Sequence, residues 1–384
     1  MKILFLVFHG FSESSGISKK IVNQVIGLRN NGHQVDLCHY DILPNGHRCR
    51  MINDEILKDY GCGKLASLKK RICYNAIYKY IVEHNIQMVY MRSNHNANPF
   101  TIHFMHKLKS QRIKVVMEIP TYPYDQEYKG FSFKDQLELK MDQLFRRSLV
   151  HELFRICTFS DCESIFGTKT IKISNGIDFD STPIKKFLRK NPNSFNLIGV
   201  AEVHYWHGFD RVIAGIGEYY QQKHDRDVFF HIVGGVGEES EMPVFKEIIE
   251  RYGIEKQIIF HGQLFGKALD DIFEDSDFGI ASLGRHRSGI TNIKTLKNRE
   301  YAARGIPFIY SEIDDDFDGM PYILKAPADD SPTDIKILIN FFYDLNISPT
   351  KIRNSVQHLS WTNQMNKVLI ETSDEQNCLH NNFS

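Results

Sequence analysis

Short apolar runs alternate with helical hydrophobic patterns along nearly the whole chain, which is typical of parallel sheets joined by crossover helices. Early in the chain, Ile17, Ile21, Val25 and Leu28 recur at helical spacing before an Asn-Gly pair, which predicts a helix between the first two strands. The strands expected in the first half are Lys2–Phe8, Val35–Tyr40, Met88–Arg92, Lys114–Ile119, Arg155–Ser160 and Ile171–Ser174.

The pattern lapses between Asp178 and Ser194 and then restarts. The lapse contains two prolines and no periodic apolar face, which indicates an interdomain linker. Beyond it we expect strands at Phe195–Ala201, Val228–Gly234, Ile258–His261, Phe278–Ser282 and Pro307–Ser311, with helices at Gly208–Gln222, Pro243–Tyr252, Gly266–Glu274, Ile293–Arg304 and Pro332–Leu345.

This alternation predicts an α/β fold of two Rossmann-like, doubly wound domains that face each other across a cleft holding the ligand. We expect one domain over residues 1–180, the linker over 181–194 and a second domain over 195–355. Residues 356–384 are expected to form a C-terminal helix, able to cross back to the first domain, and a polar tail that frays from Asp374.

Composition fits two soluble domains, since 384 residues exceed one typical core and 42% are hydrophobic. Residues 1–180 hold 25 Lys and Arg against 18 Asp and Glu, and the remainder holds 22 against 29. A basic first half suits an anionic surface or substrate, although uneven solvated charge explains it equally well. Seven scattered cysteines without a CxxC pair, and an N-terminal apolar run too short for a signal peptide, favour a cytoplasmic protein.

The segment Phe278–Tyr310 carries the most chemistry, because it reads as a strand, a basic loop, a helix and a strand. Open α/β sheets bind phosphorylated ligands where a loop leaves the carboxyl end of a strand and enters a helix. Glu300 can accept hydrogen bonds from ribose hydroxyl groups. The cations available for a diphosphate are Arg285, Arg287, Lys294 and Lys297. The segment therefore predicts a nucleoside-diphosphate ligand.

Two glycine-rich loops follow strands. In HGFSESSGISKK, Gly16 permits close backbone approach and Ser14, Ser15 or Ser18 can cap the next helix; this is either an anion pocket or a plain turn. In HIVGGVGEES the glycines lack the GxGxxG spacing of a dinucleotide site, and no strand ending in an acid follows at the distance such a site requires. The Asn-Gly pair of SNGID, at Ser174–Asp178, is by itself a turn signal.

Two polar clusters leave alternatives open. The run Asp314–Asp316 could hold Mg²⁺ or Mn²⁺, although a solvated acidic loop explains it better, and no residues elsewhere have metal-ligand spacing. Glu118–Tyr128 places carboxylates and tyrosines after a strand, as sugar binding requires, but a proline-stiffened polar loop looks the same. Arg92 and His95 end the preceding strand and are expected at the same edge of the sheet.

Two expected helices, Lys64–Val82 and Phe133–Phe154, mix cations with apolar side chains. Such surfaces lie on anionic lipid headgroups in some proteins and are ordinary solvated faces in many more. The cations in question are Lys69, Lys70, Arg71, Lys79, Arg146 and Arg147.

The ordered set of motifs resembles family 4 of the GT-B glycosyltransferases, the retaining nucleotide-sugar transferases, over nearly the full chain. The motifs that carry the resemblance are the turn at Gly16, SNGID, HGFDR (His207–Arg211), HIVGG, FHG (Phe260–Gly262) and LKNREYAARGIPFIYS. The resemblance implies an N-terminal acceptor domain and a C-terminal domain that holds a nucleotide-sugar donor.

The resemblance also implies roles for single residues. Glu300 matches the glutamate that binds the donor ribose, Gly262 falls where backbone meets the nucleobase, and Gly16 where the N-terminal domain approaches the diphosphate. The sequence departs from the family at Glu202 and His207, where an arginine and a lysine are usual. Asn292 likewise stands in place of the first glutamate of a pair. In place of the missing arginine and lysine, His207 could donate to a phosphate, and Arg285, Arg287 or Lys294 could supply the charge.

We therefore expect a retaining, metal-independent hexosyltransferase that uses no cofactor besides its nucleotide-sugar donor and binds no nucleic acid. The acceptor would be a carbohydrate or lipid-linked saccharide of bacterial surface polysaccharide synthesis, such as capsule, met at the inner face of the plasma membrane. The expected catalytic residues are Glu300, Arg287, Lys297 and Glu118, the last on the acceptor. A non-catalytic GT-B sugar-binding subunit and a nucleotide-sugar epimerase remain as alternatives.

Overall fold

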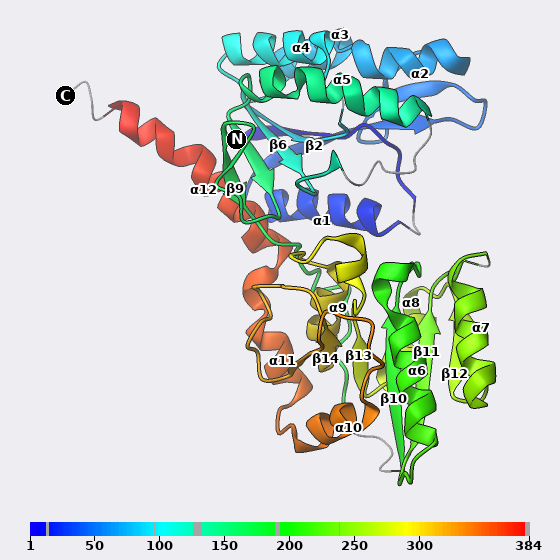
Figure 1. Ribbon diagram of the computed structural model, residues 1–384. Helices are drawn as coiled ribbons and strands as arrows, with labels where there is room; N and C mark the ends of the chain where they lie inside the picture. Colours follow the sequence, from blue (N-terminus) through cyan, green and yellow to red (C-terminus); the bar gives the residue numbers. More distant parts are fainter. Residues whose placement is uncertain (13–14, 96, 126–132, 189–192, 238, 381–384) are drawn as a thin grey trace. The chain divides into compact units, whose positions relative to one another are not determined.

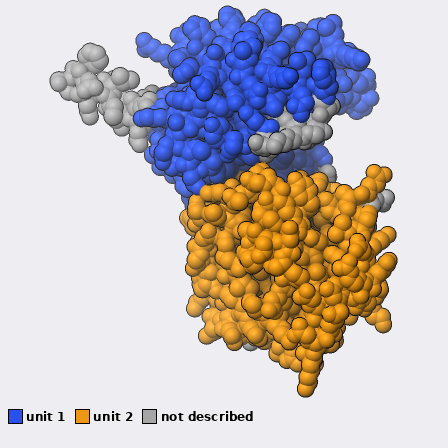
Figure 2. All heavy atoms as spheres, viewed as in Figure 1, with its two compact units in different colours: residues 1–174, 361–384 blue, residues 175–360 orange. Residues whose placement is uncertain are grey.

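The computed structural model describes residues 1–12, 15–95, 97–125, 133–188, 193–237 and 239–380, without the side chains of 374–380. The chain forms two compact units (Figure 2). Unit 1 consists of Met1–Ser174 together with Trp361–Ser384, and unit 2 consists of Asn175–Ser360. Unit 1 is therefore discontinuous in sequence, and the chain of unit 2 is inserted into it.

Unit 1 is built on a nine-stranded sheet of order β4-β3-β2-β1-β5-β6-β7-β9-β8. The six central strands, β2, β1, β5, β6, β7 and β9, pair in parallel. At the two edges, β3, β4 and β8 pair antiparallel. Their bounds are β1 Lys2–Leu6, β2 Gln34–Ile42, β3 Arg48–Ile52, β4 Glu55–Asp59, β5 Met88–Arg92, β6 Lys114–Ile119, β7 Arg155–Thr158, β8 Ser164–Ile165 and β9 Thr168–Lys172.

Helices cover both faces of this sheet (Figure 1). One apolar core lies between the sheet and α3, α4 and α5, and a second between the sheet and α1 and α12. The last helix packs tightly on the first, since a Cβ at Gly27 would lie 2.7 Å from the backbone oxygen of Trp361. The helices of this unit are α1 Gly16–Asn30, α2 Gly63–Ile72, α3 Asn75–Glu83, α4 Pro99–Ser110, α5 Phe133–Val150 and α12 Trp361–His380.

Unit 2 is built on a six-stranded, fully parallel sheet of order β12-β11-β10-β13-β14-β15. Counted along the chain, this is the order 3-2-1-4-5-6 of dinucleotide-binding Rossmann folds. The strands are β10 Ser194–Val200, β11 Asp227–Val233, β12 Ile258–Gly262, β13 Phe278–Ile280, β14 Phe308–Tyr310 and β15 Ile323–Lys325.

Helices also cover both faces of the second sheet. The core on one face includes side chains of α6, α7 and α10, and the core on the other includes side chains of α8, α9 and α11. The helices are α6 Phe209–Tyr220, α7 Glu241–Tyr252, α8 Gly266–Asp275, α9 Leu296–Arg304, α10 Ile335–Asp344 and α11 Pro349–Ser355, with 3₁₀ turns η2 Tyr205–His207, η3 Arg285–Ser288 and η4 Gln357–Leu359.

The structure confirms the α/β fold class with two doubly wound sheets, and β5 and β6 begin and end as predicted. The single helix predicted over Lys64–Val82 is wrong, because the chain breaks into α2 and α3 at Cys73 and Tyr74. Of the predicted linker, residues 189–192 lie outside the described residues, and Lys185 donates from its backbone to Arg304 of unit 2 (2.8 Å). Among the described residues, no helix combines the length and apolarity that a membrane span requires.

Candidate functional site

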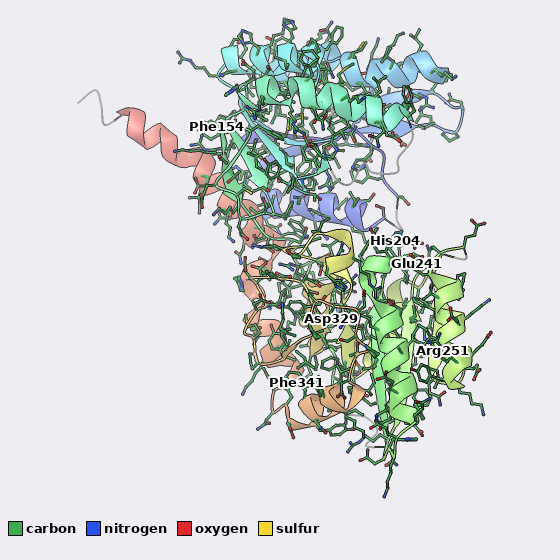
Figure 3. All side chains as sticks on the ribbon, viewed as in Figure 1. Phe154, His204, Glu241, Arg251, Asp329 and Phe341 are labelled. Carbon is green, nitrogen blue, oxygen red and sulfur yellow. The ribbon has the colours of Figure 1, made fainter. Side chains whose placement is uncertain are left out.

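The order of the unit 2 sheet reverses at β10, which pairs with β11 on one side and β13 on the other. Doubly wound sheets bind ligands at this switch point, outside the carboxyl ends of the strands. Two segments leave the sheet there, residues 201–208 after β10 and residues 281–295 after β13. His204 in the first segment and Glu241 at the start of α7 mark this end of unit 2 in Figure 3.

Backbone hydrogen bonds join these two segments directly. Leu283 N donates to His207 O (2.9 Å), and Gly284 N donates to Trp206 O (3.2 Å). Gly208 lies between them with φ +66°, and a Cβ there would be 2.7 Å from Gly284 N. Only glycine fits this crossing, because the position combines left-handed backbone with backbone-to-backbone contact. The crossing fixes His207 and Arg285, on η2 and η3, relative to each other.

His207 is buried at this crossing and is neutral. Burial, reinforced by the charges of Lys297 and Arg285, lowers the pKa of His207 well below its usual range. The backbone N–H of His204 donates to His207 Nδ1 (2.9 Å). The neutral ring therefore carries its proton on Nε2, where it can donate to an anionic oxygen without adding charge.

Lys297, in the first turn of α9, is the second cation near His207, in addition to Arg285. Burial, with repulsion by Arg285, lowers the pKa of Lys297 to about 7. The carboxylate of Glu312, which follows β14, opposes this shift, but no ion pair within 4.0 Å joins it to Lys297. Thr295 caps α9 through its Oγ1, which accepts from Asn298 N (3.4 Å). The helix N-terminus and Lys297 together favour a bound anion.

The other two predicted cations differ in how the protein holds them. Arg287 donates to both carboxylate oxygens of Asp210 (2.9 and 2.8 Å) and, through Nε, to Asp330 (2.7 Å). These carboxylates hold the pKa of Arg287 above its usual value and offset its charge. Lys294 is anchored through its backbone oxygen, which accepts from Asn175 Nδ2 (2.5 Å). Arg285 instead lies with its guanidinium 5.7 Å from the centre of the Trp206 ring, beside the site.

Glu300 lies on α9, one turn after Lys297, and is partly buried. Its Oε1 accepts from Arg304 Nε (3.1 Å), and Arg304 also donates to Asp270 (2.8 Å). Arg304 thus holds the Glu300 carboxylate in one orientation. Because Arg304 is shared with Asp270, the Glu300 carboxylate can still accept further hydrogen bonds. This placement suits an acceptor for hydroxyl groups.

The acidic run after β14 is only partly solvated, because Asp315 is exposed while Asp314 is buried. Asp314 is fully buried and, with Asp316, binds the guanidinium of Arg299, another α9 side chain. Asp318 accepts from Lys325 (2.9 Å). Within the described ranges, no group of three or more acidic, histidine or cysteine side chains suits a metal ion. The run therefore anchors α9 to the carboxyl end of β14.

The glycine loop after β11 packs against the segment after β10. A Cβ at Gly234 would lie 1.8 Å from Ala201 O, and one at Gly235 would lie 2.3 Å from the carboxylate of Glu202. Glu202 also accepts from Gln263 (3.3 Å), just beyond β12. The two glycines are thus needed for close packing between these two segments. Gly262 ends β12 with φ +65° and open space around it.

In unit 1, Gly16 is the first residue of α1. Ser15 is its N-cap, with Oγ accepting from Ser18 N (3.3 Å), while Ser14 lies outside the described residues. Glu118, the last residue but one of β6, has no exposed side-chain surface. It accepts from Tyr90 (2.7 Å) and Gln24 and pairs with Lys20 (3.6 Å) and Arg92. This environment suits a carboxylate that holds two buried cations rather than one that reaches an acceptor sugar.

Two described residues of the cluster expected to bind sugar, Tyr124 and Asp125, are bound to other side chains of unit 1. Tyr124 is buried, donates to Asp142 (2.6 Å) and stacks on His95 with ring centres 4.0 Å apart. Asp125 binds Arg146 through two hydrogen bonds (2.6 and 3.2 Å). Residues 126–128 of the predicted cluster lie outside the described residues. The part described therefore holds the loop against α5.

The structure thus gathers three of the predicted residues, His207, Arg285 and Lys297, at one switch point. It adds Glu312, which the sequence analysis did not name as a site residue. The signal that could have found it is its position directly after the strand ending at Ser311, because side chains there reach the edge of the sheet where ligands bind.

Comparison by sequence finds no relatives: no protein-family model matches the chain, and no curated protein is similar enough to match. Comparison by structure finds glycosyltransferases of the GT-B fold. A sucrose-phosphate synthase from Thermosynechococcus elongatus aligns with TM-score 0.61 and 14% identity over 97% of this chain and 98% of its own.

Two further solved structures match along nearly their whole length. HepE from Anabaena, in complex with UDP and glucose, aligns with TM-score 0.55 and 14% identity over 98% of this chain and 100% of its own. WaaG, a glycosyltransferase involved in lipopolysaccharide biosynthesis, aligns with TM-score 0.50 and 11% identity over 95% and 94%. At this identity the likeness concerns architecture, and the chain has the two-domain, Rossmann-like fold of the GT-B glycosyltransferases.

Proposed function

We propose that this protein is a retaining glycosyltransferase of the family 4 type, which moves a hexose from a nucleoside-diphosphate sugar to a carbohydrate or lipid-linked saccharide. The observation that carries the proposal is the meeting of His207, Arg285 and Lys297 at the switch point of unit 2. A diphosphate needs fixed hydrogen-bond donors and cations, and this place supplies both.

The chemistry asked of these residues is stabilisation of the departing diphosphate. Lys297 and Arg285 supply positive charge, His207 Nε2 supplies a neutral donor, and the N-terminus of α9 adds its dipole. Side-chain cations would thus do the work of a metal, so the reaction needs no metal and no cofactor. No protein nucleophile is invoked, because in retaining transferases of this type the leaving phosphate helps deprotonate the acceptor. Glu300 would bind the ribose, with Gly262 at the base and Gly16 and Lys294 near the donor.

The structural comparisons support a nucleotide-sugar donor. HepE has been solved with UDP and with UDP-glucose, and it shares the fold of this chain along its length. WaaG acts in lipopolysaccharide biosynthesis, which agrees with an acceptor from bacterial surface polysaccharide, such as capsule. A cytoplasmic location at the inner face of the plasma membrane follows from that acceptor.

Titration calorimetry with UDP and GDP tests the donor site. Replacing Lys297 by Met should weaken binding of the preferred diphosphate by at least about tenfold, as for a lost charged hydrogen bond. Lys256→Met is the control, since Lys256 is an exposed lysine of the same unit, placed before the amino end of β12. Failure of the wild-type protein to bind either diphosphate would overturn the proposal.

Two rival functions keep a specific observation in their favour, because Glu202 puts a negative charge against the glycine loop where the family carries a cation. They are a non-catalytic sugar-binding subunit and a nucleotide-sugar epimerase. Release of free nucleotide from UDP- and GDP-sugars, with and without saccharide acceptors, separates the three. A transferase releases nucleotide only with its acceptor, an epimerase converts the sugar without one, and a non-catalytic subunit does neither.

Membrane attachment would use α2 and α5, whose exposed surface combines apolar and basic side chains. Phe133, Leu137, Met141 and Leu144 lie at helical spacing along α5, and Phe133 is 85% exposed. Several predicted cations are engaged inside the unit instead, such as Arg71 with Glu138 (2.6 Å) and Arg146 with Asp125. The exposed cations near the stripe are Lys64, Lys69, Lys134, Lys140 and Arg147. Such a surface suits an anionic bilayer.

Sedimentation with lipid vesicles tests this surface. The protein should bind vesicles containing phosphatidylglycerol and not pure phosphatidylcholine, and the double variant Phe133→Ser, Leu144→Ser should lose most of that binding. Ile337→Ser is the matched control, an exposed isoleucine on α10 of unit 2. Equal binding by the double variant and the wild type would exclude α5 as the contact.

A further inference from the structure

The carboxylate of Glu312 lies at the carboxyl end of β14 with 2% of its surface exposed, and neither of its oxygens has a hydrogen-bond partner among the described residues. Its backbone is fixed, since its carbonyl oxygen accepts from Lys325 Nζ. A buried carboxylate without partners is costly and is rarely kept for folding alone. The side chain is therefore placed to receive groups that a ligand brings.

The charges around Glu312 identify which part of a ligand lies near it. Lys297 and Arg285 attract its carboxylate and Asp314 repels it, while burial raises its pKa. The same two cations form the proposed diphosphate site. The loop before α9 is joined to the Glu312 segment, because Ile293 N donates to Ile313 O (3.0 Å) and Ile313 N to Thr291 O (2.7 Å). Glu312 thus borders the phosphates without being an ion-pair partner of their cations.

In a nucleoside-diphosphate sugar, hydroxyl groups flank the phosphates on two sides, as the ribose and as the transferred sugar. Glu300, on α9, is assigned to the ribose. We propose that Glu312 accepts hydrogen bonds from hydroxyl groups of the transferred sugar, and that it selects neutral hexose donors over uronic acid donors. This inference rests on the proposed function and names the donor class of that site.

The selectivity follows from charge. Burial raises the pKa of Glu312 to about 7, so above this pH its carboxylate is ionised and offers about four lone-pair positions to hydroxyl donors. A uronic acid brings a second carboxylate to the same buried place, where like charges repel strongly because little water screens them. Replacing Glu312 by Gln keeps the size and the accepting oxygen but removes the charge, so it should relax the discrimination.

Calorimetric titration of UDP, UDP-glucose and UDP-glucuronic acid into the full-length wild type and Glu312→Gln tests the inference; GDP, GDP-mannose and GDP-mannuronic acid serve if guanosine is preferred. The wild type should bind the neutral sugar nucleotide at least about tenfold more tightly than the uronic one. The Glu312→Gln variant should bind the neutral donor about tenfold more weakly than the wild type and bind the bare diphosphate equally well. Its preference for the neutral over the uronic donor should narrow to roughly threefold. Glu255→Gln, at an exposed carboxylate before β12, should change none of these affinities.

Equal losses for the diphosphate and the neutral donor would overturn the inference, because Glu312 would then support the nucleotide or the fold. Unchanged binding of the neutral donor by Glu312→Gln would overturn it as well. In both cases the proposed function would stand, whereas failure of the wild type to bind any of the six nucleotides would remove both. If Glu312→Gln does not fold, Glu312→Asp should show the same selective loss for the neutral donor.

Discussion

Buried carboxylates in this protein differ in whether the chain itself supplies their partners. Glu118 lies among Lys20, Arg92, Tyr90 and Gln24, whereas Glu312 has no hydrogen-bond partner in the part of the chain that the structure describes. Both residues lie at the carboxyl end of a parallel strand, so their sequence contexts are similar. Contacts from distant elements decide between a structural and a ligand-binding role, and sequence spacing does not contain them. For this reason the sequence analysis favoured Glu118 as a site residue and passed over Glu312.

The structural role of Glu118 predicts a large loss of stability in Glu118→Gln. Burial alone would raise the pKa of Glu118, but Lys20 and Arg92 outweigh it and hold the pKa below its usual value. Burial lowers the pKa of Lys20 to about 8 even with Glu118 present. Without the negative charge both cations lose their counter-charge, and unit 1 should lose about 3 kcal/mol in denaturant unfolding.

Glu138→Gln is the control for this measurement. Glu138 pairs with Arg71 (2.6 Å) on the surface of the same unit, with both side chains about a quarter exposed. Such a pair contributes less than about 1 kcal/mol. Similar small losses in both variants would show that the Glu118 cluster is not held by its charges.

At the scale of elements, most strands and helices could be predicted because each buried parallel strand is a continuous apolar run. The antiparallel hairpin of β3 and β4 escaped prediction, since its sequence RCRMINDEILKD is largely polar. The break between α2 and α3 escaped it too, because no glycine or proline marks it. Arg50 donates to Lys70 O (3.2 Å) and Tyr60 to Cys73 O (3.2 Å), so side chains from β3 and beyond β4 bind the carbonyl groups that end α2.

The candidate site was predictable as a segment but not as a set of contacts. The strand–loop–helix pattern placed Lys297 and Glu300 on one turn of a helix, as the structure has them. The same pattern predicted Arg285 and Arg287 equally as ligands of a diphosphate. Arg287 is bound by Asp210 on α6 and by Asp330, residues remote in sequence, and this pairing could not be predicted without the fold.

The crossing of η2 and η3 makes Gly208 the most sensitive position among these elements. Gly208→Ala should destabilise unit 2 by about 2 kcal/mol, since it adds left-handed strain and a clash with Gly284 N. It should also weaken diphosphate binding at least about tenfold, because the clash moves His207 away from Arg285. Calorimetry and thermal unfolding measure the two effects.

The control variant Gly253→Ala separates the effect of left-handed backbone strain from the effect of disturbing the η2–η3 crossing. Gly253 has nearly the same φ, +67°, with no heavy atom within 4 Å of an added Cβ. It should cost about 1 kcal/mol and leave nucleotide binding unchanged. A binding loss in Gly253→Ala as large as that in Gly208→Ala would mean that the crossing does not position the site.

At the scale of the whole molecule, the chain leaves unit 1 after Ser174 and returns to it at Trp361. Trp361, Met365, Val368 and Leu369 of α12 are buried in the core beside α1. Burying four such side chains contributes roughly 6–12 kcal/mol, which is comparable with the whole stability of a domain. Unit 1 therefore depends on a segment that follows unit 2 in the chain, whereas unit 2 is continuous.

This asymmetry predicts different behaviour of the two fragments. Residues 175–360 alone should unfold cooperatively and bind UDP or GDP, whichever the full chain prefers, within about threefold of the full-length affinity, because His207, Arg285 and Lys297 all lie in unit 2. Residues 1–174 alone should lack cooperative unfolding, since the apolar side of α1 is then uncovered, and joining residues 361–380 through a glycine–serine linker should restore it.

Cooperative unfolding of 1–174 without that helix would show that α12 is an accessory rather than part of the core. Loss of nucleotide binding by a folded 175–360 fragment would instead show that unit 1 supplies essential donor contacts.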